Sequence, residues 1–256
     1  MHTRDRLFDV GGLAILVAGG AGGLGTAIVR ELAVRGARVV VADVDQGRAE
    51  AVATQVSAAS GEVRGISLNV TDSNSCKDAV DFTIGAFGRL DALVNASGVY
   101  RVSPALEMTD DDWERTIDIN LTGAFRLARA AGRAMIPQRS GSIVTVTSVS
   151  SKVSNPNYAA YAASKAGAAH VTRILALEWA STGIRVNALG PAVTPTPLTT
   201  ELFEDAGAVA NALAKIPMGR FGTPEDLLGA VLFMLSPASM FMTGQVIYVD
   251  GGRTIF

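Results

Sequence analysis

The sequence predicts an α/β fold: a doubly wound domain with a seven-stranded, mainly parallel sheet and helices on both faces. Two observations lead to it. Short apolar runs alternate with segments of helical periodicity almost to the end of the chain, which is typical of a parallel sheet covered by helices. Hydrophobic residues make up 48% of the 256 positions and charged residues 18%, a balance that suits one large core and argues against disorder. We therefore interpret residues 1–256 as a single domain.

The expected elements follow this alternation along the chain. We expect strands near 13–18, 38–42, 63–68, 91–95, 142–147, 184–188 and 245–249. We expect helices near 23–35, 46–59, 73–87, 111–136, 158–181 and 224–235. One stretch, 190–223, is irregular and rich in proline around a helix-like piece at 199–215. A long loop that begins where a strand ends is more often functional than idle, so we interpret 190–223 as a substrate lid.

The first expected strand, 13–18, is a short apolar run suited to a buried parallel strand. It leads into Gly19-Gly-Ala-Gly-Gly-Leu-Gly25 and then into a segment of helical periodicity, 26–34. Glycines between a strand and a helix let the backbone approach a pyrophosphate, which then lies on the free amides of the helix start. Taken alone, such glycines also suit a flexible turn.

The second expected strand, 38–42, ends at Asp43, eighteen residues after Gly25. An acid at this point can accept hydrogen bonds from the ribose hydroxyls of NAD, and it would repel the 2′-phosphate of NADP. No lysine or arginine lies between Gly19 and Gly25 to neutralise that phosphate. The spacing therefore indicates a dinucleotide and favours NAD over NADP.

The expected helix 111–136 begins beside three consecutive acids, Asp110 to Asp112. We interpret them as an N-terminal cap whose charge complements the helix dipole, and not as a metal site.

The fifth expected strand, 142–147, ends next to Ser148, and the helix that follows carries Tyr161 and Lys165. Residues four apart share one helix face, so the phenol and the ammonium point into the same space. A nearby cation favours the phenolate form of tyrosine, whose ordinary pKa is about 10. Ser148 can hydrogen-bond the same oxygen or a substrate oxygen beside it. Such a set removes a proton from an alcohol or returns one to a ketone, although Tyr-x-x-x-Lys also occurs in ordinary surface helices.

Two neighbours of Tyr161 are candidates for the same role. Tyr158 lies one turn earlier but has alanine at position 162, where a lysine partner would stand, so we expect it to form a wall of the pocket or to serve in packing. His170 lies nine residues after Tyr161, which at about 100° per residue is the opposite side of the helix. We do not expect His170 to be catalytic.

The bulk composition excludes several classes of function. The net charge of −2 provides no basic footprint for nucleic acid. One cysteine, Cys76, and two histidines argue against an internal disulfide and against a metal site. The apolar stretch after the charged N-terminus is too short for a signal peptide or a membrane span. We therefore expect a soluble, cytoplasmic protein that does not bind membranes.

Five motifs in order resemble the short-chain dehydrogenase/reductase family, in its single-domain NAD-dependent form of about 250 residues. They are Ala18-Gly-Gly-Ala-Gly-Gly-Leu-Gly25, Leu68-Asn-Val-Thr-Asp72, Asn95-Ala-Ser-Gly98, the set of Ser148, Tyr161 and Lys165, and Gly190-Pro-Ala-Val-Thr-Pro-Thr196. Asn120, in Ile117-Asp-Ile-Asn-Leu-Thr-Gly123, is similar to the family's helix asparagine, and the ending Thr243 to Gly252 resembles its last strand. The resemblance implies a Rossmann-type fold.

The resemblance also implies residue roles. Catalytic roles would fall to Asn120, Ser148, Tyr161 and Lys165. NAD contacts would fall to Gly19, Gly22, Gly23, Leu24, Gly25, Asp43, Asn69, Val70, Asn95, Ala96, Ser97, Gly98, Tyr161, Lys165, Pro191, Ala192, Thr194 and Thr196. Ala18, Asn69 and Ala192 depart from the family pattern, and we expect weaker cofactor binding from them without loss of the chemistry.

We interpret the protein as an NAD-dependent enzyme that interconverts a secondary alcohol and a ketone. Tyr161 would act as general acid/base, Lys165 would lower its pKa and hold the nicotinamide ribose, Ser148 would orient the substrate oxygen, and Asn120 would complete a proton relay. The same residues could serve isomerisation or dehydration. From a different class, the chain could be a non-catalytic NAD-binding regulator, which the intact Ser-Tyr-Lys set disfavours.

The substrate class and the oligomeric state are predicted from weaker sequence features. Ser103, Asn155 and Asn157 could line a polar pocket for a polyol or sugar acid, which resembles part of the family. Val153, Leu198 and Phe203 could instead serve an apolar hydroxysteroid or a hydroxyacyl substrate. The apolar ending, 230–256, resembles that of relatives that form tetramers, so we expect a homotetramer.

Overall fold

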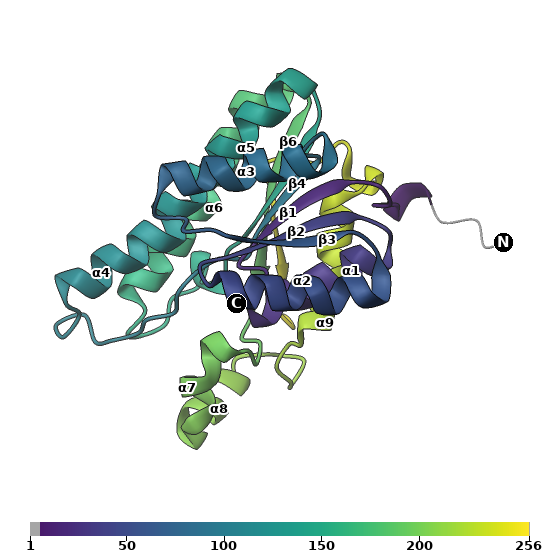
Figure 1. The fold of residues 1–256 in the computed structure, drawn as a ribbon. Coiled ribbons are helices and arrows are strands. Elements are labelled where there is room, and N and C mark those ends of the chain that lie inside the picture. Colours follow the sequence, from purple (N-terminus) through teal and green to yellow (C-terminus); the bar gives the residue numbers. More distant parts are fainter. Residues whose placement is uncertain (1–5, 256) are drawn as a thin grey trace.

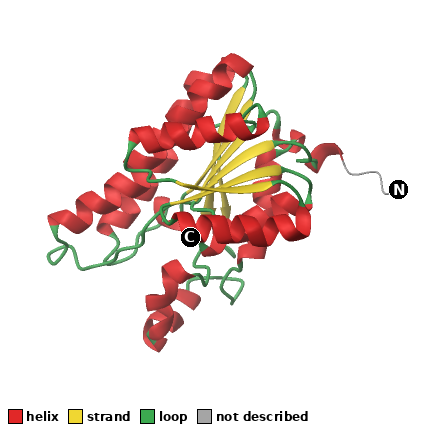
Figure 2. Ribbon diagram, viewed as in Figure 1, coloured by secondary structure: helices red, strands yellow, loops and turns green. Residues whose placement is uncertain are grey.

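The computed structural model describes residues 6–255 and has a parallel sheet at its centre (Figure 2). Within this range the sheet has seven strands, all parallel, in the order β3-β2-β1-β4-β5-β6-β7. The strands are β1 (Ala14–Ala18), β2 (Arg38–Asp43), β3 (Val63–Ser67), β4 (Ala92–Asn95), β5 (Gly141–Val146), β6 (Ile184–Pro191) and β7 (Val246–Val249). The predicted doubly wound α/β sheet is confirmed.

Helices cover both faces of this sheet (Figure 1). One face carries α1 (Gly23–Val34), α2 (Gln46–Ser60) and α9 (Pro224–Leu235). The other carries α3 (Ser73–Phe87), α5 (Ala124–Gln138) and α6 (Ala159–Trp179). Two separate apolar clusters result, one on each side of the sheet.

The first strand shows why this sequence forms a two-faced core. Successive strand side chains point to opposite faces, so a strand buried on both sides must be apolar at every position. In β1, Ile15 and Val17 pack with α1, α2 and α9, whereas Ala14, Leu16 and Ala18 pack with α3 and α5. All five are fully buried.

The strand order reverses between β1 and β4, and this reversal positions the functional end of the sheet. Ala18 at the end of β1 is in register with Asn95 at the end of β4. The loops that follow these two strands therefore diverge from one point, and ligands of open α/β sheets bind there.

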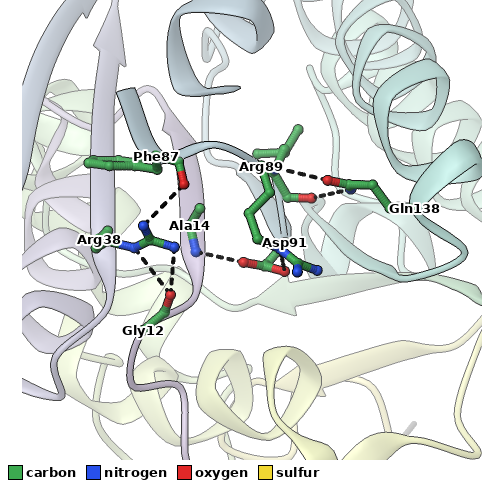
Figure 3. Close-up of polar contacts among 8 residues, drawn as sticks. Gly12, Ala14, Arg38, Phe87, Arg89, Asp91 and Gln138 are labelled. Atoms are coloured by element: carbon green, nitrogen blue, oxygen red, sulfur yellow. Dashed lines mark hydrogen bonds and ion pairs between the residues drawn. The ribbon is translucent and has the colours of Figure 1, made fainter. Parts of the chain in front are cut away.

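Side chains hold together the opposite, amino-terminal edge of the strands (Figure 3). The Arg38 guanidinium donates to the Gly12 carbonyl at 3.0 and 3.2 Å and to the Phe87 carbonyl at 3.1 Å. Asp91 accepts a hydrogen bond from the Ala14 amide at 2.9 Å. These contacts join β1, β2 and β4 at the end that carries no predicted site residue.

The expected helix 111–136 is interrupted in the structure. It consists of α4 (Asp110–Ile117), a six-residue π-helical segment (Asp118–Gly123) and α5. Such π segments insert one residue into a helix and are frequent at functional sites, and this one contains Asn120. The expected cap was also wrong in detail, because the Thr109 hydroxyl accepts from the Asp112 amide and the three acids form the first turn.

The irregular stretch 190–223 differs from expectation in its helical content. Strand β6 extends to Pro191, beyond the expected 188, because it pairs with β7 over its last residues. A 3₁₀ turn (Pro197–Thr199) and two short helices, α7 (Thr200–Glu204) and α8 (Ala206–Leu213), follow. Figure 1 shows α7 and α8 standing away from the helices that cover the sheet. Within residues 6–255, no helix is long and apolar enough to span a membrane.

Candidate active site

A large cavity lies at the carboxyl ends of the strands. Its volume is about 1510 Å³, above the roughly 300–1,000 Å³ of ordinary ligand pockets, so it has room for two ligands. It extends from Asp43 at the end of β2 to the 190–223 segment. Every predicted catalytic and cofactor-binding residue lines it except Asn95 and Asn120, which are buried.

The glycine loop between β1 and α1 forms the floor of this cavity. A Cβ atom on Gly25 would lie 2.0 Å from the Gly19 carbonyl oxygen, so the loop can close only with glycine there. Helix α1 starts at Gly23, and its N-cap residue is Gly22. Among the described residues, no side chain at this position caps the free amides of the first turn. Uncapped amides at a helix start favour an anion, so the loop fits the pyrophosphate of a dinucleotide.

The segment after β6 folds back over this loop. A Cβ atom on Gly23 would lie 2.9 Å from Thr196 Cβ, which places Thr196 directly against the start of α1. Pro191, Ala192 and Thr194 line the cavity on the way. These predicted cofactor residues are therefore brought next to the glycine loop, although more than 160 positions separate them in the sequence.

Two opposite charges flank the turn at Ala21. The Ala21 amide donates to Asp43 Oδ2 at 3.2 Å, and the Arg48 guanidinium donates to the Ala21 carbonyl at 2.7 Å. Both side chains line the cavity. Arg48 was missed from the sequence, since only residues within the glycine loop were considered as partners for a 2′-phosphate.

The Asn69 side chain is folded into its own turn. Its Oδ1 accepts from the Thr71 amide at 3.0 Å and from the Thr71 hydroxyl at 2.8 Å, so both lone pairs are used. This oxygen is thus already engaged and does not face a bound cofactor as a free acceptor. Val70, the next residue, lines the cavity with an apolar side chain.

Asn120 links the π segment to its neighbours. Its Oδ1 accepts from the Val99 amide at 2.8 Å, and its Nδ2 donates to the Val99 carbonyl at 2.9 Å and to Ser164 Oγ at 3.1 Å. A Cβ atom on Gly98 would lie 3.0 Å from Asn120 Oδ1 and 3.4 Å from Lys165 Nζ. Asn120 and Lys165 therefore both approach the space that a side chain at Gly98 would fill.

Tyr161 and Lys165 converge on the cavity as the helical spacing predicts, and Ser148 joins them there as the family resemblance implies. Tyr161 is 9% exposed and Lys165 is 6% exposed. The Lys165 ammonium donates to the Val146 carbonyl at 3.0 Å and lies 5.8 Å from the centre of the Tyr161 ring. The Ser148 side chain lies close enough to the Tyr161 phenol to act on its pKa.

Burial sets the protonation of this pair. It raises the pKa of Tyr161 to about 12, while the nearby Ser148 side chain acts in the opposite direction. Burial lowers the pKa of Lys165 to about 8. We expected Lys165 to lower the pKa of Tyr161, but in the chain alone desolvation outweighs any such effect. Tyr161 is therefore protonated at neutral pH and able to donate a proton.

Tyr100 is a site residue that sequence reasoning missed. Its ring packs edge to face on Tyr158 and on Tyr161, with ring centres 5.7 and 5.1 Å apart. The hydroxyls of Tyr100 and Tyr158 hydrogen-bond each other, and burial raises the pKa of Tyr100. Tyr158 is thus a wall residue whose hydroxyl is already engaged. Tyr100 follows the predicted cofactor residue Gly98 by two positions, and this proximity could have indicated from the sequence that it lies near the site.

The far end of the cavity has a mixed lining. Asn155, Asn157 and Leu198 line it as expected, together with Leu202, Lys215 and Arg253. Ser103, Val153 and Phe203 do not. Phe203 packs instead on Phe221, with ring centres 5.1 Å apart.

In the part of the chain that the structure describes, the histidine, the cysteine and the acidic side chains show no sign of a catalytic or metal-binding role. His170 is exposed on α6. Burial raises the pKa of the Cys76 thiol to about 11, so it is unreactive at neutral pH. Across residues 6–255, no group of three or more His, Cys, Asp or Glu side chains is arranged to hold a metal ion.

Comparisons with known proteins cover nearly the whole chain. A family model described as enoyl-(acyl carrier protein) reductase matches residues 19–254. D-Threitol dehydrogenase of Mycolicibacterium smegmatis is 39% identical over 249 residues, 97% of this chain and 95% of that protein. The 3-oxoacyl-[acyl-carrier-protein] reductase FabG of Thermotoga maritima is 39% identical over 244 residues, 95% of this chain and 98% of that protein.

A solved structure agrees over the same extent. The gluconate 5-dehydrogenase of Burkholderia cenocepacia J2315, in complex with NADP and tartrate, superposes with a TM-score of 0.94 at 33% identity. The match covers 99% of both chains.

Proposed function

This chain belongs to the short-chain dehydrogenase/reductase family of oxidoreductases, and from that premise we propose that it interconverts a secondary alcohol and a ketone with NAD as cofactor. One observation carries the proposal: Ser148, Tyr161 and Lys165 meet in the same cavity as the glycine loop. A bound nicotinamide would take up or supply the hydride.

The chain's own residues supply position and a proton. Tyr161 donates its phenolic proton to a ketone oxygen or, as phenolate, takes one from an alcohol. Ser148 orients that oxygen, and Lys165 binds a ribose hydroxyl while its charge favours the phenolate. Asn120 holds the π segment against Val99 and completes a proton relay beside Lys165. Segment 190–223 closes over the substrate as a lid.

Cofactor choice is expected to depend on Asp43. A 2′-phosphate facing this carboxylate meets like-charge repulsion of several kcal/mol, so wild-type kcat/KM with NAD should exceed that with NADP by about 100-fold or more. Asp43→Ser should narrow this ratio mainly by weakening NAD. Initial rates with both cofactors test it.

Arg48 could counter this effect of Asp43, because its positive charge lies on the other side of Ala21 and would attract a 2′-phosphate. Two similar solved structures contain NADP. Arg48→Ala should leave NAD kinetics nearly unchanged and lower any residual activity with NADP. Equal catalytic efficiency of the wild type with both cofactors would overturn the assignment to NAD.

For the substrate we propose a polyol or a sugar acid. The D-threitol and gluconate dehydrogenases among the relatives support it, as do Asn155 and Asn157 in the cavity lining. A hydroxyacyl or hydroxysteroid substrate is the second candidate, favoured by the FabG relative and by Leu198 and Leu202. Initial rates on matched polyols, sugar acids, hydroxyacyl thioesters and hydroxysteroids separate the two. No NADH formation or consumption on any of them would favour a non-catalytic NAD-binding regulator.

We further propose a cytoplasmic homotetramer with two-fold symmetry. Met240 is 70% exposed and Phe241 fully exposed, just before β7, where a lone chain would leave apolar surface in water. Light scattering at micromolar concentration should give four times the 26.5 kDa chain mass. Phe241→Ser should shift the assembly toward smaller species. A stable wild-type monomer would refute the proposal.

A further inference from the structure

Two cationic side chains converge on one neutral oxygen at the far end of the cavity. Lys215 Nζ donates to Asn155 Oδ1 at 3.1 Å, and an Arg253 Nη2 donates to the same oxygen at 3.3 Å. All three residues line the cavity. An amide oxygen carries no net charge, so it aligns the two cations without neutralising them.

No acid compensates these charges within the described part of the chain. Neither Lys215 nor Arg253 has a carboxylate oxygen within 4 Å, whereas six other cations do. Asp250 is the acid nearest to Arg253 in the sequence, but its carboxylate is engaged by backbone amides. Its two oxygens accept from the Gly252 amide at 2.9 Å and from the Thr254 amide at 2.8 Å. The pair thus offers positive charge to the cavity.

The fold builds this arrangement from three distant segments. The turn after β7 packs closely on the end of the lid, since a Cβ atom on Gly251 would lie 2.7 Å from Ile216 Cγ2, and the Met218 amide donates to the Gly251 carbonyl at 3.0 Å. This contact brings Arg253 beside Lys215. Asn155 comes from the loop between Ser148 and Tyr161, which ties the cations to the catalytic segment.

We propose that Asn155, Lys215 and Arg253 form a subsite for the carboxylate of a hydroxy-acid substrate. An arginine fork and a lysine point charge suit the two oxygens of a carboxylate. A polyol has no charge to place there. The proposal rests on the proposed alcohol–ketone chemistry and narrows its substrate class to sugar acids.

The first test compares an aldonic acid with the polyol of the same carbon chain, using NAD. The wild type should favour the acid by about tenfold or more in kcat/KM. Arg253→Gln and Lys215→Gln should each raise KM for the acid by about 10- to 100-fold, leave kcat within a few-fold, and leave polyol kinetics unchanged. Lys152→Gln is the matched control. Lys152 is a cation in the loop that carries Asn155, but its side chain does not line the cavity.

Asn155→Asp separates a binding role from a structural one. The new carboxylate would pair with both cations and occupy the subsite from within. The variant should lose the preference for the acid while its melting temperature stays equal or rises. A purely structural cluster predicts the same thermal result with the preference intact, and that outcome would overturn the proposal.

A binding measurement keeps the subsite distinct from the proposed reaction. The aldonic acid should raise the melting temperature of the wild-type–NAD complex, less so at high salt, and should not raise that of Arg253→Gln. If the acid binds in this way but the enzyme oxidises none of the alcohols, the proposed function is contradicted and the carboxylate subsite is still supported. Activity that is equal on acid and polyol, or confined to sugar phosphates or acyl thioesters, would sink the subsite.

Discussion

Replacing Tyr161 with phenylalanine is expected to lower turnover by about 10²–10⁴, the usual contribution of general acid/base catalysis, while NAD binds nearly as in the wild type. Tyr161 is 9% exposed and lines the cavity together with Ser148, so we expect its hydroxyl to meet the substrate oxygen. Steady-state rates and NAD titration by fluorescence measure the two effects separately.

Two neighbouring tyrosines provide matched controls. The hydroxyls of Tyr100 and Tyr158 are engaged with each other, and both rings pack edge to face on Tyr161. Tyr158→Phe and Tyr100→Phe remove the same atom from the same wall and should each lose less than about tenfold. The assignment is wrong if Tyr158→Phe is inactive and Tyr161→Phe keeps more than a tenth of the activity.

The pH profile is a second readout of the same assignment. Because burial raises the pKa of Tyr161 to about 12, the phenolate needed for alcohol oxidation is scarce at neutral pH and increases as pH rises. Oxidation by the wild type should therefore speed up from pH 7 to 9, whereas ketone reduction, which needs the protonated phenol, should not gain. Tyr161→Phe should lose this rise.

The second large effect is expected from Gly25→Ala. A methyl group there would lie 2.0 Å from the Gly19 carbonyl oxygen, which is backbone and has no side-chain rotamer with which to give way. Overpacking of this kind costs about 1–3 kcal/mol or more, and it would distort the amides offered to the pyrophosphate. We expect NAD affinity to fall by well over tenfold and the melting temperature to drop.

Gly85→Ala is the matched control for this change. Gly85 lies inside α3, and among the described residues nothing stands within 4 Å of a Cβ atom added there. Alanine at this position should stabilise the fold by about 0.5–1 kcal/mol and leave NAD binding unchanged. If Gly25→Ala bound NAD as the wild type does, the close approach at the glycine loop would have no functional consequence.

Local patterns in the chain were sufficient for the sheet and for the Tyr161–Lys165 pair. Alternation of apolar runs and helical segments depends on near neighbours, and a four-residue spacing defines one helix face without any tertiary information. The same logic failed for the helix expected at 111–136. No local pattern announced the π segment that places Asn120 against Val99 and Ser164.

The sequence by itself therefore determined the fold class, the glycine loop, the acid at position 43 and the Ser-Tyr-Lys set. The tertiary structure alone decided three things: that Tyr100 joins Tyr158 and Tyr161, that Arg48 shares the Ala21 turn with Asp43, and that Lys215 and Arg253 meet on Asn155. It also decided that desolvation raises the pKa of Tyr161. The physical reason is common to all of these. Contacts between segments depend on strand order and loop packing, and a pKa depends on the water excluded around the group, neither of which residue spacing records.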